Sequence, residues 1–438
     1  MRSGVIAVAA VGLLLFVVPL LGGEHGQISQ YGITWTLDKP AVAGRFVNGD
    51  WWVVGPVTVK SISPAPAPGR NGSVVNPKAG DAQGYDDRIP DYDAKLAATF
   101  LLELKPGQSL VSTASVEKVG VKTPNMVPHQ YCRGPLRTAT ILTCVEKPPQ
   151  PDAFRPPYVG EKKPIFSAKK LRRDLLPKLK APCTPASLAP YERVLQRVWL
   201  DHKRQWSGRQ LHPLENMPDY GRELTNITSQ VGLLLLVEDP DRKHETLLVR
   251  FVQLGIDLYG ITQSADDLWP ANGGHHSGRK WPIIFAGLML DHEGMRKVRA
   301  TFAEDKQTYY GKGFKGQKVL FHLHDGPNGE HEEVDPATWE TYGQGANNGK
   351  KAEGYRRLNG PTWIGQALAA RLMGVKADWG HDEYFDYVDR WWKEEVEGKD
   401  EKSATGAGGG LFVWKMWETY RKTADEIGAS VTKKRAQR

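Results

Sequence analysis

The glycine-rich segment 272–282 brings together side chains that can move protons and bind anions. It reads Asn-Gly-Gly-His-His-Ser-Gly-Arg-Lys-Trp-Pro. Histidines exchange protons near neutral pH, basic side chains bind carboxylate or sulfate, and a tryptophan ring can stack on a sugar. The segment precedes an apolar stretch expected to be helical, and a helix N-terminus also favours anions. The alternative is a loop whose histidines only cap that helix. The candidates are His275, His276, Arg279, Lys280 and Trp281.

A second polar segment, 355–363, reads Tyr-Arg-Arg-Leu-Asn-Gly-Pro-Thr-Trp. It is expected to precede another helix, with Pro361 near the helix start. Positive charge beside a tyrosine favours the phenolate, which a tyrosine base would need. The alternative is an arginine pair in surface or interdomain salt bridges, with the tyrosine in the core. The candidates are Tyr355, Arg356, Arg357, Asn359 and Trp363.

Two amides upstream share one predicted helix face. Asn226 and Gln230 are four residues apart, so they lie one above the other on a helix. Their side chains could bind a substrate carboxyl group and reduce its charge. Taken alone, they fit an ordinary polar helix face better.

Three histidines in or near a predicted β-hairpin, residues 317–334, are candidates for a metal site. His322 and His324 would share one face of a strand, and His331 could complete the ligand set. The hairpin is polar throughout, so a solvated hairpin is the favoured interpretation. We therefore expect no cofactor, with a divalent metal as the alternative.

Other catalytic patterns receive less support. There is no glycine-rich phosphate loop, GxSxG elbow or HExxH motif, which argues against nucleotide chemistry, an esterase and a zinc peptidase. Isolated carboxylates could form the acid pair of a glycoside hydrolase. These are Asp266, Asp267, Asp291 and Asp335.

Composition indicates a globular protein of two or three domains. The chain has 438 residues, with 58 Lys and Arg against 50 Asp and Glu, a formal charge of +8. The excess is modest and spread along the chain, which suits an acidic partner, but the dense basic blocks typical of nucleic-acid tails are absent. Eleven of the 14 tryptophans follow residue 185. Those expected in loops or at helix ends suit carbohydrate binding: Trp206, Trp269, Trp281, Trp339, Trp363 and Trp379.

The N-terminus predicts export. Residues 4–21 are apolar and uncharged, follow the basic start Met1-Arg2-Ser3, and precede Gly22-Gly23. This pattern is typical of a signal peptide, here 1–23, and predicts a secreted or periplasmic protein without a stable membrane span after signal removal. A retained single-span anchor is the alternative. Of three cysteines, Cys132 and Cys144 could form a disulfide that leaves Cys183 over, or all could be free thiols.

The patterning changes near residue 185. Short alternating runs predict an antiparallel, β-sandwich-like domain over 24–146, followed by a Pro- and Lys-rich linker over 147–189 that packs across both domains. Helical periodicity over 190–425 predicts helical hairpins in an arc or toroid, and 426–438 would be a basic tail. The expected helices are 191–206, 219–237, 244–259, 282–290, 295–302, 361–373, 383–392 and 411–421.

The helical half resembles secreted polysaccharide lyases with an α/α-toroid domain, which act on alginate, glucuronan or related uronates. The resemblance rests on the helical hairpins, segment 272–281, Tyr355-Arg356-Arg357 and Asn226. It implies β-elimination, with Tyr355 as base or acid and His275 or His276 as its partner. The uronate carboxylate would be held by Asn226, Arg279 and Arg356. A glycoside hydrolase and a non-catalytic glycan-binding or cell-surface protein are the alternatives.

Overall fold

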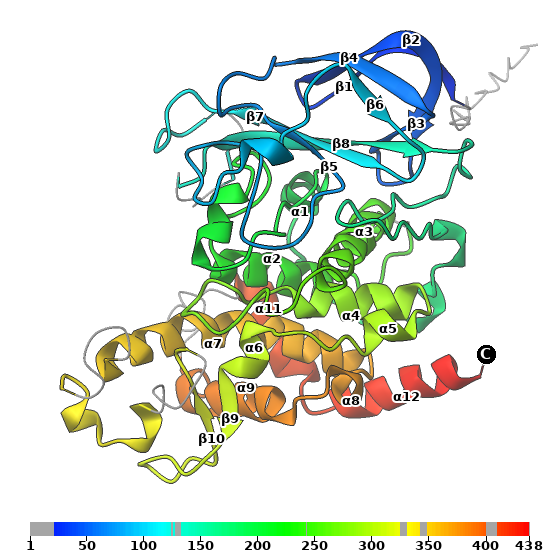
Figure 1. The fold of residues 1–438 in the computed structure, drawn as a ribbon. Coiled ribbons are helices and arrows are strands. Elements are labelled where there is room, and N and C mark those ends of the chain that lie inside the picture. Colours follow the sequence, from blue (N-terminus) through cyan, green and yellow to red (C-terminus); the bar gives the residue numbers. More distant parts are fainter. Residues whose placement is uncertain are drawn as a thin grey trace, which may run out of the picture.

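The computed structural model describes residues 22–123, 126–127, 133–241, 243–324, 331–341, 348–399 and 410–437. A curled β-sheet lies at one end of the molecule and helices fill the rest (Figure 1). Most of the predicted signal peptide, residues 1–21, lies outside the described residues. Among the described helices, none combines the length and the apolar character that crossing a bilayer requires.

Strands β1 to β8 form one eight-stranded sheet in the order β5-β7-β8-β3-β2-β4-β6, with β1 paired to β2. Strand β2 explains why one curled sheet replaces the expected sandwich: its first half pairs with β4 and its last residues pair with β3. Alternate residues such as Ile33, Trp35 and Leu37 are buried inside the curl. The strands are β1 (Gly23–Gln30), β2 (Ile33–Arg45), β3 (Trp51–Val54), β4 (Val57–Ser63), β5 (Ser73–Val75), β6 (Leu102–Leu104), β7 (Ser109–Ser115) and β8 (Leu136–Val145).

The long helix α7 contacts α2, α9, α11 and α12, whereas α3 packs against α1 and α4. A short strand pair, β9 (Thr308–Tyr310) with β10 (Val319–Phe321), lies against α9. The helices are α1 (Ala189–Leu195), α2 (Gly221–Leu234), α3 (Glu245–Thr262), α4 (Lys280–Met289), α5 (Glu293–Arg296), α6 (Ala303–Lys306), α7 (Gly349–Leu372), α8 (Lys376–Trp379), α9 (Asp382–Glu395), α11 (Gly410–Tyr420) and α12 (Ala424–Ala436).

The segment between β8 and α1 runs down one side of the molecule, from the sheet to the helices (Figure 1). Within it, the buried Arg155 joins the two halves. Its Nε donates to Asp50 beside the sheet at 2.6 Å, and its Nη1 donates to Asp257 of α3 at 2.9 Å. Because all three charges are buried, this contact fixes the sheet to the helices through the linker.

Several elements differ from the sequence-based expectations. Helix α7 begins at Gly349, not near Pro361, because Asn348 caps it by accepting a hydrogen bond from the Lys351 amide. Pro361 therefore lies inside the helix, and segment 355–363 is helical rather than a loop. The predicted tail largely belongs to α12, whose buried Val431 packs in the core.

The predicted hairpin over 317–334 is also different. Strand β10 pairs with β9 upstream, and His331–Glu333 forms a 3₁₀ turn. The expected turn at 325–329 lies outside the described residues. Cys144 is a buried free thiol that donates to the Leu104 carbonyl at 3.4 Å, so it forms no disulfide; Cys132 lies outside the described residues.

Candidate functional site

The two polar segments, 272–282 and 355–363, pack against each other although they are far apart in the chain. A methyl group added at Gly273 would lie 2.7 Å from Cε1 of Tyr355, so the loop backbone rests on the tyrosine ring. Gly273 has a φ of +55°, a conformation that favours glycine. Four residues after Tyr355 on the same face of α7, Asn359 donates from Nδ2 to the Gly273 carbonyl at 2.7 Å.

This contact brings His275 beside a second tyrosine. The rings of His275 and Tyr220 meet edge to face, with centroids 4.7 Å apart and planes at 90°. Tyr220 immediately precedes α2 and is close enough to Tyr355 for their hydroxyl groups to interact electrostatically. Two phenols and one imidazole are thus gathered between α2, α7 and the glycine loop.

An arginine and a tryptophan complete the arrangement. Nη1 of Arg209 lies 3.5 Å from both ring nitrogens of His275, and its guanidinium stacks on Trp206 with Cζ 4.0 Å from the ring centroid. Trp206 is 47% exposed, whereas the other members are partly buried. We call the set Trp206, Arg209, Tyr220, His275 and Tyr355 the Tyr–His cluster.

The protonation states in the cluster follow from burial. Burial, reinforced by the positive charge of Arg209, lowers the pKa of His275 to about 3, so the imidazole is neutral at neutral pH. Burial also lowers the pKa of Arg209 to about 10, which leaves it charged. Burial and the neighbouring Tyr355 raise the pKa of Tyr220, which stays a protonated phenol. The cluster therefore holds a proton acceptor, a proton donor and a fixed cation.

Arg279 holds the loop from behind. Its Nε and Nη2 donate to the Asp201 carboxylate at 2.7 and 3.1 Å, and its Nη1 donates to the carbonyls of His275 and Ser277 at 3.1 and 2.8 Å. The buried His212 also contacts Asp201. Although burial opposes ionisation, Arg279 and His212 hold the pKa of Asp201 below its usual range. Arg279 therefore positions His275 and has its donors engaged within the protein.

His276 differs from its neighbour in environment. It is almost fully buried, with Nδ1 2.8 Å from the Pro270 carbonyl, and burial lowers its pKa to about 4. A carbonyl only accepts hydrogen bonds, so Nδ1 carries the proton and donates it. Of the two histidines, His275 is the one that contacts the phenol of Tyr220.

Three other predicted binding residues are buried in the core. Lys280 donates to the Trp379 carbonyl at 2.9 Å and pairs with Asp305. The Trp281 ring packs on Gly232, and Nε1 of Trp363 donates to the Ser277 hydroxyl at 3.2 Å. Side chains so enclosed are not accessible to a sugar at the surface.

The arginine pair after Tyr355 faces carboxylates. Arg356 is buried, and its guanidinium donates to Glu353 and to Glu395, each at 2.6 Å. Arg357 is exposed and lies 2.8 Å from Glu353. Their positive charges are neutralised locally, so the pair supports the helix–helix contact between α7 and α9.

The two amides of α2 lie beyond the cluster along the helix. Asn226 is partly buried, and its Oδ1 is enclosed without a hydrogen-bond partner among the described residues. Gln230 is buried and hydrogen-bonds through its side chain to Tyr191. Among the described residues, both amides thus keep an enclosed oxygen without a partner, and Gln230 in addition serves the contact with α1.

The three candidate metal ligands have separate environments. His322 packs edge-on against Tyr309, His324 forms a backbone bridge with Asn272, and His331 lies 3.4 Å from Glu353. Within the parts of the chain that are described, no three His, Cys, Asp or Glu side chains are gathered in a way that could hold a metal ion.

Arg209 and Tyr220 belong to the cluster but are not predicted from the sequence. Tyr220 is a lone aromatic before a helix, and nothing local indicates its contact with a loop 55 residues later. The only signal for Arg209 is its spacing of three from Trp206, which aligns both side chains on the 3₁₀ turn Trp206–Leu211.

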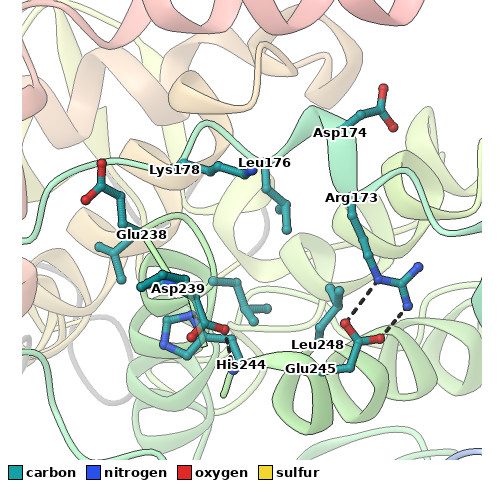
Figure 2. Close-up of a pocket in the computed structure, with 12 residues that line it drawn as sticks. Arg173, Asp174, Leu176, Lys178, Glu238, Asp239, His244, Glu245 and Leu248 are labelled. Atoms are coloured by element: carbon teal, nitrogen blue, oxygen red, sulfur yellow. Dashed lines mark hydrogen bonds and ion pairs between the residues drawn. The ribbon is translucent and has the colours of Figure 1, made fainter. Parts of the chain in front are cut away.

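A cavity of about 570 Å³ opens at the opposite end of α2 (Figure 2). Leucines and a valine form much of its wall, and the Arg173–Glu245 ion pair lies at its edge. No member of the Tyr–His cluster lines this cavity. Since α2 spans about 20 Å, the cavity is a separate feature of the surface.

Comparisons with family models, with curated proteins and with solved structures find no match to this chain.

Proposed function

We propose that the protein is a lyase that cleaves an anionic, uronate-containing polysaccharide by β-elimination. The observation that carries the proposal is the contact of a neutral His275 with Tyr220 and with the charged Arg209, on a loop packed against Tyr355. This combination supplies the three groups that the reaction needs: a base, an acid and a cation for the carboxylate.

In the proposed reaction Arg209 binds the uronate carboxylate, which stabilises the negative charge that develops as the adjacent C5 loses its proton. His275 accepts that proton. The electron pair forms the C4–C5 double bond, and the C4–oxygen bond to the neighbouring sugar breaks. Tyr355 donates a proton to the leaving oxygen, and Tyr220 orients the imidazole.

Substrate binding itself would make His275 a better base. In the free protein the positive charge of Arg209 is one reason why the pKa of His275 is low. A carboxylate paired with Arg209 offsets that charge and raises the proton affinity of the imidazole. The base would thus be activated when an anionic sugar is in place.

Polymer capture is supported by two further features. The formal charge of +8 favours the approach of a polyanion, and the exposed ring of Trp206 offers a stacking surface beside Arg209. The toroid-like arrangement of the helical hairpins and export from the cytoplasm are parts of the same proposal.

The test is incubation of the protein with alginate, glucuronan, ulvan and glycosaminoglycans while the absorbance of an unsaturated product is followed. We expect absorbance to rise with at least one polymer and not with the His275→Ala variant. Tyr310→Phe, at an exposed position on β9, is the matched control. Absence of unsaturated product from every polymer rejects the lyase for those substrates.

A non-catalytic glycan-binding protein is the second candidate, favoured by the stacked Trp206–Arg209 pair. Such a protein would be retarded in an affinity gel that contains the polymer and would leave the polymer length unchanged. Release of reducing ends without an unsaturated product would instead identify a hydrolase.

A further inference from the structure

Lys163 is a half-buried lysine of the linker and lies outside the Tyr–His cluster. Its Nζ donates to the carbonyls of Pro157 and Tyr158 at 2.7 and 3.1 Å. Two charged groups act on it from the buried contact that joins sheet and helices. Arg155 disfavours a second cation, and the carboxylate of Asp257 partly offsets this effect.

Lys163 lines a cavity of about 590 Å³ between the end of β8 and the linker, and its Nζ lies at the carbonyls of Pro157 and Tyr158 beside this cavity. This volume is within the range of small-molecule sites. The walls are largely apolar, with a phenylalanine and several proline rings. The apolar lining residues include Pro106, Val145, Pro148, Pro149, Pro156, Ile165 and Phe166.

The two hydrogen bonds can be made by either form of the amine. The neutral form donates its two N–H groups to the two carbonyls and keeps its lone pair, whereas the ammonium has no lone pair for attack. Burial, reinforced by Arg155, lowers the pKa of Lys163 to about 7, so about half of the molecules carry the free amine at pH 7.

We propose that Lys163 is the nucleophile of a binding site for apolar aldehydes. The Nζ lone pair attacks the aldehyde carbon, and the carbonyl oxygen takes up protons and leaves as water. The product is a protonated imine. It keeps one N–H, which can still donate to the Pro157 carbonyl, while the apolar group of the aldehyde occupies the cavity.

The thiol of Cys144 lines the same cavity. Burial raises the pKa of this thiol to about 12, and its Sγ donates to the Leu104 carbonyl. It is therefore protonated and weakly nucleophilic at neutral pH. A second lysine of the lining, Lys147, has an exposed side chain. Lys163 is thus the half-buried amine on which the proposal rests.

The experiment treats the full-length protein with benzaldehyde and sodium cyanoborohydride, which reduces the imine to a stable secondary amine. Peptide mass spectrometry then compares labelling of Lys163 with that of the exposed Lys162. At pH 7 an ordinary lysine is neutral in less than about one molecule in a thousand. We expect Lys163 to be labelled at least tenfold faster, and its rate to level off above about pH 8 while that of Lys162 continues to rise.

Two comparisons make the result decisive. Lys162→Arg should leave labelling at position 163 unchanged. Glyoxylate, a small anionic aldehyde, should label Lys163 more slowly than benzaldehyde does, because the walls are apolar. Equal labelling of both lysines overturns the proposed nucleophile, and equal rates with both aldehydes overturn the apolar ligand class. The site-resolved comparison uses the unmodified protein, so it does not depend on the folding of a Lys163 variant.

Discussion

His275 and Tyr220 meet edge to face, with ring centroids 4.7 Å apart, although they come from a loop and from the residue before a helix. The contact depends on a loop backbone that lies flat against Tyr355 of α7 and on Arg279, which donates to the His275 carbonyl. The geometry of the proposed reaction is therefore set by groups on three separate elements.

Removing the Tyr355 hydroxyl should remove most turnover. Tyr355→Phe keeps the ring that packs on Gly273 but cannot donate a proton, so we expect kcat to fall by about 10²–10⁴-fold with little change in KM or in thermal stability. Steady-state kinetics on the best polymer and a melting curve measure both. Normal turnover by this variant would exclude Tyr355 from proton transfer.

The contact between the Gly273 backbone and the Tyr355 ring allows a test of whether the loop positions His275. Gly273→Ala places a methyl group 2.7 Å from Tyr355 in a backbone conformation with positive φ. Gly107→Ala is the matched control, because Gly107 also has a positive φ but has open space around it. The positive φ alone should cost each variant roughly 1–2 kcal/mol of stability, and the overlap with Tyr355 adds to this cost at Gly273. Only the Gly273 variant should also lose lyase activity. Equal losses of activity in the two variants would refute the role of Gly273 in positioning His275.

Buried neutral histidines predict acid instability. Burial lowers the pKa of His202 and His275 to about 3 and that of His276 to about 4. In the unfolded chain these groups take up protons near pH 6.5. Between these values the unfolded state binds more protons, so the free energy of unfolding decreases as pH falls from about 6.5 towards 3.

Denaturant unfolding at several pH values measures this dependence. The His202→Gln variant should be less stable at pH 7, yet its stability should decline less steeply between about pH 6.5 and 4 than that of the unmodified protein. Parallel curves for the two proteins would contradict the assignment of His202 as a buried neutral group.

The charge of Arg155 should be essential for stability. Arg155→Met leaves Asp50 and Asp257 buried without their partner, and loss of one member of a buried ion pair costs about 3–5 kcal/mol. Arg357→Met removes an exposed arginine that also contacts carboxylates and should cost about 1 kcal/mol or less. Equal losses in the free energy of unfolding in urea would show that the buried ion pairs of Arg155 contribute no more stability than the exposed ion pair of Arg357.

The elements could be predicted where a periodic pattern is local. Alternating burial through Ile33, Trp35 and Leu37 makes β2 recognisable, and α2 and α3 lie within a few residues of their expected ends. The start of α7 could not be predicted from Pro361, because a proline is common at a first helical turn and tolerated inside a helix only when packing supports it.

The candidate site could be predicted only in part, because local patterns do not encode tertiary contacts. His275 and Tyr355 are recognisable from reactive residue types in glycine-rich surroundings. Arg209 and Tyr220 become partners of His275 only through tertiary packing, which no local pattern encodes. The same packing encloses Arg279 and Lys280, whose residue types alone suggest ligand binding.

Arg155 couples the N-terminal sheet to the helices, so the two halves cannot be separated without breaking a buried ion pair. One guanidinium serves the sheet, the linker and α3 at once. A truncation between β8 and α1 would therefore separate Arg155 from either Asp50 or Asp257, and the carboxylate that loses the guanidinium would remain without its partner.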